Sequence, residues 1–229
     1  MNDESSFKPR MKNQENEIVN KTIEFVKDAL QKSEGGHDWW HAYRVWKMSK
    51  QIAKQEKADL FTVQLGALLH DIADAKFHNG NEELGPEIAA AFLSELGVEK
   101  TVIDHVVAII QNISFKNSFE ESSFESLELD IIGDADRLDA IGAIGIARTF
   151  NYGGHKGFAL YNPDIPPQKY QNKEDYKNSD APTVNHFYEK LFLLKDRMRT
   201  KTGKKMAEQR HRFMKEYLGQ FFGEWEGER

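Results

Sequence analysis

The chain has 229 residues, of which 39% are hydrophobic and 30% charged, and its net charge is −6. This balance suits a soluble globular protein and argues against a bulk nucleic-acid binder. The absence of cysteine excludes disulfides, zinc–thiolate sites and cysteine nucleophiles. No apolar run reaches the roughly 20 residues that span a bilayer, and the polar N-terminus lacks a signal-peptide core. We therefore expect a cytoplasmic protein that partners neither nucleic acid nor membrane.

Apolar residues recur at helical spacing along most of the chain, without convincing strand alternation or internal repeats, so the predicted class is all-α. Residues 1–13 are predicted to be a disordered tail, and residues 14–229 a single domain. Asp59 is a plausible N-cap, and Pro86 suits the first turn of a helix that ends at Leu96. The other predicted helices span residues 15–32, 38–55, 60–72, 98–113, 127–150, 183–200 and 204–222.

The segment over about 151–182 is too long for an ordinary connection between helices. It contains several prolines and glycines, which stop regular helix. We expect it to be either a functional lid or partly disordered.

One apolar helical run, residues 65–72, contains the pair His70-Asp71. A buried unpaired carboxylate costs several kcal/mol to desolvate, so something must compensate Asp71. A divalent cation is the natural candidate, because imidazole nitrogen and carboxylate oxygen are both common metal ligands. Two ligands do not hold a metal for chemistry, so further ligands are expected elsewhere in the chain.

Other histidines and carboxylates with a suitable setting lie on either side of this pair. His37 and His41 are four residues apart and therefore share one face of a helix. Downstream, Asp134, Asp136 and Asp139 interrupt an otherwise apolar helix, where carboxylates are usually paired or metal-bound. The alternative for each is structural: a satisfied histidine, or an aspartate in a salt bridge with Arg137 or Arg148.

The order His41, His70-Asp71, Asp136 resembles that of the HD-domain metal-dependent phosphohydrolases. The local contexts agree: HAYRV after His41, ALLHDI around the pair, and ADRL around Asp136. The resemblance implies a helical bundle with a C-terminal helical extension and a long loop or lid. It also implies that these four residues bind one divalent ion, most naturally Mn²⁺, with Mg²⁺, Fe²⁺, Co²⁺, Ni²⁺ or Zn²⁺ as alternatives.

A narrower resemblance covers almost the whole chain. The segments GHDWWH at 36–41, DADRLDAIG at 134–142 and NHFYEKL at 185–191 are similar to the YpgQ/YedJ-like subgroup. Members of that subgroup are understood as Mn²⁺-dependent nucleoside triphosphate pyrophosphohydrolases. The resemblance therefore implies a nucleotide substrate, in a monomer or a homodimer.

Further residues are expected to act on the substrate. Asp74, one helical turn after Asp71, can orient the attacking water, and Lys76 can clamp a phosphate. A salt bridge or helix cap is the alternative for Asp74, and a solvated surface lysine for Lys76. The candidate substrate-binding residues are His37, Arg44, Arg148, His186 and Lys190. The last two are four residues apart, and their positive charges would suit a triphosphate.

Several functions remain compatible with these residues. A 5′-nucleotidase or a cyclic-nucleotide phosphodiesterase would use the same metal ligands. A nucleotide-sensing module would bind the metal without catalysis, and an all-α interaction protein would bind none. A second metal ion is not expected, although His78 and His105 lie in the interval where two-metal relatives carry extra histidines.

Overall fold

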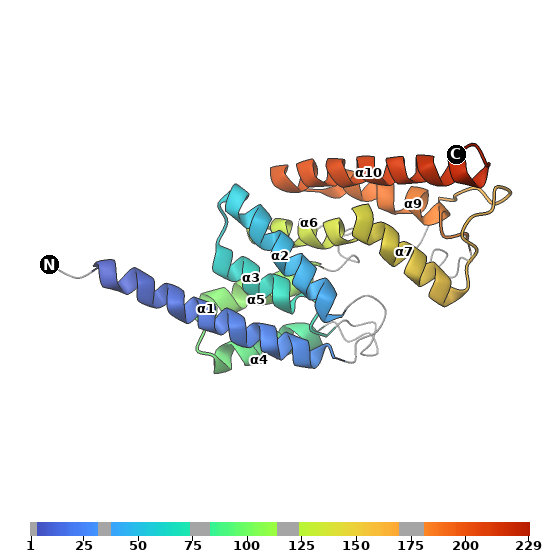
Figure 1. The fold of residues 1–229 in the computed structure, drawn as a ribbon. Helices are drawn as coiled ribbons and strands as arrows, with labels where there is room; N and C mark the ends of the chain where they lie inside the picture. Colours follow the sequence, from blue (N-terminus) through green and yellow to red (C-terminus); the bar gives the residue numbers. More distant parts are fainter. Residues whose placement is uncertain (1–3, 32–37, 74–82, 114–123, 170–180) are drawn as a thin grey trace. The chain divides into compact units, whose positions relative to one another are not determined.

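The structure is a computed structural model that describes residues 4–31, 38–73, 83–113, 124–169 and 181–229 (Figure 1). Throughout these residues the regular structure is helical, without a strand, which confirms the predicted all-α class. None of the helices described is both long enough and apolar enough to cross a membrane. The chain divides into two compact units, residues 1–135 and 136–229, and each is described by itself. The single domain expected over residues 14–229 stays a prediction.

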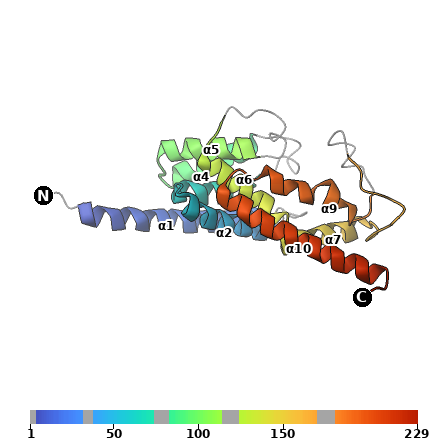
Figure 2. The same cartoon turned by 90° about the horizontal axis from the view of Figure 1, so that it is seen from above.

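The first unit is built around a short helix that is buried on all sides. Its helices are α1 (Glu4–Ala29), α2 (Trp39–Glu56), α3 (Leu60–Leu69), α4 (Leu84–Glu95), α5 (Lys100–Ile113) and most of α6 (Leu127–Asp139). Helix α3 packs against α1, α2 and α5, and every residue from Thr62 to Leu69 is buried. A helix that is apolar all round belongs in a core rather than on a surface. Helices α4 and α5 lie side by side (Figure 2).

The start of α3 is fixed by Asp59, as predicted. Its carboxylate accepts hydrogen bonds from the N–H groups of Phe61 and Thr62. These groups have no partner within the helix, so the cap satisfies them. Close packing continues at Gly66, where a Cβ atom would lie 2.8 Å from Ile132 Cδ1 of α6.

Helix α1 begins at Glu4, where the sequence predicts a disordered tail over residues 1–13 and a helix only from residue 15. The helix is anchored further along by buried residues, among them Ile18, Val19 and Val26. Once a helix is nucleated, each added residue costs little. The helix therefore extends back from this anchored part to Glu4.

The second unit comprises the end of α6 and the C-terminal helices. These are α7 (Gly142–Lys156), α9 (Asn185–Glu189), the 3₁₀ helix η3 (Leu191–Arg197) and α10 (Lys201–Trp225). Helix α10 packs against α7 and η3. Aromatic rings fill part of this core: Phe187 of α9 stacks on Tyr217 of α10 with ring centroids 6.2 Å apart.

The single helix predicted over residues 127–150 is wrong, because α6 and α7 are separate helices. Gly142, the first residue of α7, has φ +75°, which residues with a side chain rarely adopt. Gly145 then approaches the Ala140 carbonyl so closely that a Cβ atom there would clash. These two glycines therefore form a sharp corner between α6 and α7.

The helix predicted over residues 183–200 is also interrupted. Lys190 adopts φ −140° and ψ −56°, which ends α9, and the chain continues as the 3₁₀ helix. The preceding long segment starts at Gly157 rather than at residue 151, because α7 continues to Lys156. Its described first part is attached to the α9 region: the N–H of Thr183 donates to the Ala159 carbonyl at 2.8 Å. Residues 170–180 lie outside the described residues.

Removing side-chain volume from α3 should destabilise the first unit strongly. We expect Leu68→Ala to lower the free energy of unfolding by about 2–5 kcal/mol, because Leu68 is fully buried and its loss leaves a cavity. The matched control is Leu127→Ala, at a leucine that is 40% exposed, with an expected cost below about 1 kcal/mol. Urea denaturation measures both, and equal costs would contradict the central place of α3.

Candidate metal centre

His41 lies in the first turn of α2, where a helix cap fixes the backbone. The Asp38 side chain is the N-cap and accepts a hydrogen bond from the His41 N–H at 2.9 Å. The imidazole itself is directed inward, with only 2% of the side chain exposed. Asp38 therefore positions a predicted ligand by its capping role.

His70 comes directly after the last residue of α3, and its ring orientation is set by the helix itself. Its Nδ1 lies 2.9 Å from the Ala67 carbonyl oxygen. A carbonyl oxygen can only accept, so Nδ1 carries the proton and the lone pair of the neutral ring lies on Nε2. Nε2 is buried and forms no hydrogen bond to any residue that the structure describes. This arrangement is the one that metal-binding histidines use, with one nitrogen fixed by a backbone carbonyl and the other directed at the metal.

Asp71 brings the two imidazoles to a common point. Its Oδ2 lies 3.4 Å from His41 Nε2 and 3.4 Å from His70 Nε2. One ligand atom from each of the three residues lies within 4.8 Å of the others. Ligands at about 2.0–2.2 Å from a shared ion are separated by roughly 3–3.5 Å, so these distances fit a divalent cation. The predicted association of His41 with His70 and Asp71 is thus found in the structure.

The structure does not place the next four predicted site residues at this centre. Three of them, His37, Asp74 and Lys76, lie outside the described residues. Asp136 belongs to the second compact unit, so its role as a fourth ligand stays a prediction. Arg44 lies in α2 one turn after His41, and its side chain is half-buried.

Arg148 has a partner within its own unit. It forms an ion pair with Asp139, whose side chain is 2% exposed, while the arginine side chain remains 33% exposed. This is the structural alternative considered for the aspartates of this helix, and for Asp139 it is confirmed. Substrate binding by Arg148 stays a prediction.

His186 does not supply the positive charge expected of it. Burial, together with the nearby Lys190 ammonium group, lowers the pKa of His186 to about 4. The imidazole is therefore neutral at neutral pH, and of these two residues only Lys190 can act there as a cation. The sequence pattern placed the two residues on one helix but contained no information about burial.

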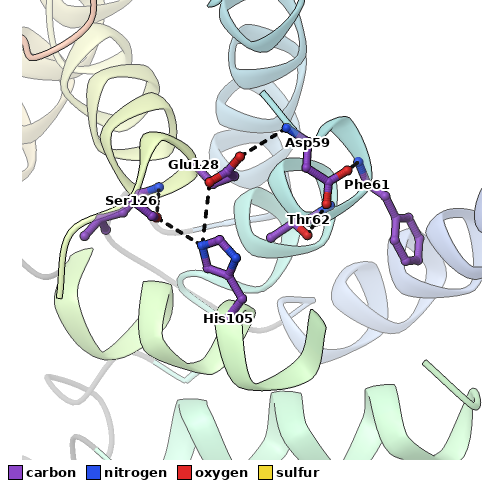
Figure 3. A network of polar contacts seen from close by, with 7 residues as sticks. Asp59, Phe61, Thr62, His105, Ser126 and Glu128 are labelled. Atoms are coloured by element: carbon purple, nitrogen blue, oxygen red, sulfur yellow. Dashed lines mark hydrogen bonds and ion pairs between the residues drawn. The ribbon is translucent and has the colours of Figure 1, made fainter. Parts of the chain in front are cut away.

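His105, considered as an extra metal ligand, belongs to a different network (Figure 3). Its Nε2 lies 3.0 Å from Ser126 Oγ and 3.7 Å from Glu128 Oε2. Ser126 also accepts the Leu129 N–H at 3.1 Å near the start of α6, and Glu128 accepts the Asp59 N–H at 3.1 Å. The network therefore connects the starts of α3 and α6 to α5. Glu128 and Ser126 both contact Nε2 of His105. In a catalytic triad the acid and the serine contact opposite nitrogens of the histidine, so the role of His105 is structural.

Sequence reasoning missed this network, although a serine just before an apolar helix is a recognised capping signal. It also missed Arg210 of α10, which donates from Nη1 to the Leu138 carbonyl at the end of α6. Nothing in the local pattern around Arg210 distinguishes it from the exposed basic residues of the same helix.

With this geometry in view, comparison with known proteins identifies the class. Residues 39–141 match the HD domain family. That match includes His41, His70, Asp71 and Asp136, and the chain belongs to the HD superfamily, as a metal-dependent phosphohydrolase of the YpgQ-like subgroup.

The relatives extend over nearly the whole chain. One solved relative is an HD-superfamily hydrolase from Bacillus thuringiensis, whose sequence is 44% identical to this chain. Its crystal structure superposes with a TM-score of 0.76, and the match covers 93% of this chain and 98% of that chain. YpgQ of Bacillus subtilis is 37% identical over 204 residues, 86% of this chain and 88% of YpgQ. A crystal structure of YpgQ in complex with ADP has a TM-score of 0.71 and 35% identity, covering 91% of this chain and 95% of that one.

Removal of one predicted ligand should weaken metal binding strongly while leaving the fold intact. We expect Asp71→Asn to weaken Mn²⁺ binding more than about a hundredfold, beyond the 10–100-fold typical of outer-shell changes. Isothermal titration calorimetry measures the affinity, and circular dichroism verifies the helices. His105→Gln is the control, expected to keep wild-type affinity because His105 belongs to the structural network. Equal affinity of Asp71→Asn and the wild type would exclude this centre.

The lowered pKa of His186 should make stability depend on pH. Below pH 6.5 the unfolded chain binds a proton that the folded histidine does not bind until about pH 4. As the pH is lowered from 6.5 to about 4, the free energy of unfolding should therefore decrease. His186 contributes at most about 3 kcal/mol to this decrease. Urea denaturation at pH 7 and pH 5 should show a smaller loss in His186→Gln than in the wild type. The exposed His155→Gln is the control, and an unchanged loss in His186→Gln would contradict the burial of this imidazole.

Proposed function

We propose that this protein hydrolyses the α–β phosphoanhydride bond of nucleoside or deoxynucleoside triphosphates, releasing the monophosphate and pyrophosphate, with Mn²⁺ as its metal. The observation that carries the proposal is the buried group of His41, His70 and Asp71 in a chain that aligns with almost all of YpgQ, a protein crystallised with ADP. The ADP in that YpgQ crystal structure supports a nucleotide as the small-molecule partner of this protein.

The chemistry follows from the donor set. His41, His70 and Asp71 would hold the ion through two nitrogens and one oxygen, and Asp136 is proposed as the fourth ligand from its sequence motif. Mixed nitrogen and oxygen donors suit Mn²⁺ better than Ca²⁺. When bound, such an ion polarises a phosphoryl oxygen and lowers the pKa of a bound water. Four protein ligands also leave coordination positions for that water and for a phosphate oxygen.

The residues around the metal would manage the charge of the substrate. Asp74 is proposed to orient the water and Lys76 to bind a phosphate, both from their places after Asp71 in the sequence. Arg44 and Lys190 remain the proposed cations for the triphosphate. Neutral His186 would then contribute a hydrogen bond rather than a charge.

Product analysis tests the proposal directly. We expect purified protein with Mn²⁺ to convert NTPs or dNTPs to the monophosphate and pyrophosphate, detected by ion-exchange chromatography and ³¹P NMR. The Asp71→Asn variant, expected to lack the metal, is the blank for contaminating hydrolases. Removal of Mn²⁺ by a chelator should stop the reaction, and adding the ion back should restore it.

Other product patterns would replace the proposal with a defined alternative. Free phosphate from monophosphates would indicate a 5′-nucleotidase, and opening of cyclic nucleotides would indicate a phosphodiesterase. Nucleotide binding with no turnover of any substrate in the panel would indicate a sensing module.

A further inference from the structure

Two arginines from later helices hold the last turn of α6, the turn that follows Asp136. Asp139 is buried at the end of this helix and forms an ion pair with Arg148 of α7. Arg210 of α10 donates a hydrogen bond from Nη1 to the Leu138 carbonyl. The end of α6 is thus attached to both long helices of the second unit.

The chemistry of a helix C-terminus explains why arginine stands here. The last carbonyls of a helix have no partner in the α pattern, and they carry the negative end of the helix dipole. The Leu138 carbonyl oxygen accepts one hydrogen bond from the Ile141 N–H at 3.2 Å and a second from Arg210 Nη1. These two bonds occupy both lone pairs of that oxygen. An acid at this end is unfavourable by itself, so buried Asp139 depends on the positive charges of Arg148 and Arg210.

Gly142 makes the approach of Arg210 feasible. It has φ +75°, and a Cβ atom on it would lie 2.9 Å from Arg210 Cγ and 3.1 Å from Arg210 Cβ. The aliphatic part of the arginine therefore lies directly on the glycine backbone. The corner between α6 and α7 and the position of Arg210 are mutually dependent.

We propose that Arg210 is a positioning residue for Asp136: it fixes the last turn of α6, and thereby the place of the Asp136 carboxylate. Asp136 and Asp139 are three residues apart and lie on a similar side of the helix, so a shift of the last turn moves both. The inference rests on the proposed role of Asp136 as the fourth metal ligand. It gives the C-terminal helix, which lies beyond the HD domain match at 39–141, a part in metal binding.

The test is the Mn²⁺ affinity of variants at this corner. Arg210→Met keeps much of the aliphatic stem and removes the guanidinium, and we expect it to weaken Mn²⁺ binding about tenfold, within the range of outer-shell changes. Arg210→Lys should recover part of the loss. Gly142→Ala, which displaces the stem, should weaken binding in the same direction. Exposed Arg212→Met in the same helix is the control and should bind as the wild type does.

Kinetics separate positioning from a general loss of structure. With Arg210→Met the Mn²⁺ concentration for half-maximal activity should rise about tenfold, while the nucleotide KM at saturating Mn²⁺ stays within about twofold. A purely structural role would lower the melting temperature and the active fraction, and would leave the Mn²⁺ affinity of the folded protein unchanged. That result overturns the proposal. If Arg210→Met does not fold, Arg210→Lys and Gly142→Ala decide by the same criterion.

Asp136→Asn distinguishes this inference from the proposed function. Wild-type Mn²⁺ affinity in Asp136→Asn would show that Asp136 is not a ligand, so its proposed ligand role and the positioning role of Arg210 would both fail, while product analysis decides the hydrolysis reaction separately. Loss of affinity in Asp136→Asn with wild-type affinity in the folded Arg210 and Gly142 variants would reject the positioning role alone.

Discussion

A carboxylate between two buried imidazoles is the constraint on which the rest of this structure depends. Asp71 Oδ2 is equally close to the Nε2 atoms of His41 and His70, and both imidazole side chains are almost fully removed from water. Such a group is costly to bury unless a charge compensates it. The geometry and the donor types both favour a divalent cation, and membership of the HD superfamily agrees with that chemistry.

The helices of the first unit place these atoms by simple means. Helix α3 is buried on all sides, and His70 lies at its C-terminal end. Nδ1 of His70 is fixed there by a hydrogen bond to the Ala67 carbonyl. Helix α2 delivers His41 from its capped first turn. The two ends belong to helices that pack against each other, so the side chains of His41 and His70 meet without a long loop between them. Rigid elements of this kind hold a metal site more precisely than loops do.

The second unit uses a different device at the end of α6. A glycine with positive φ turns the chain, Arg210 of α10 binds the Leu138 carbonyl at the end of α6, and Arg148 of α7 binds the buried Asp139. The family match ends at residue 141, just before this glycine. Arg148 and Arg210, which stabilise the corner, therefore belong to the C-terminal extension. The YpgQ structure matches 91% of this chain, so the similarity continues beyond the family match.

The sequence by itself determined the helical class and the cap at Asp59, and it pointed to His41, His70 and Asp71 as a group that could hold a metal. These features depend on local rules: apolar periodicity, capping chemistry, and the cost of charge in an apolar run. Only the tertiary structure decided that His186 is neutral, that His105 belongs to a structural network and that Arg210 reaches the Leu138 carbonyl. Those properties arise from desolvation and from contacts between residues far apart in the chain, Arg210 and Leu138 being 72 residues apart, which no local pattern encodes.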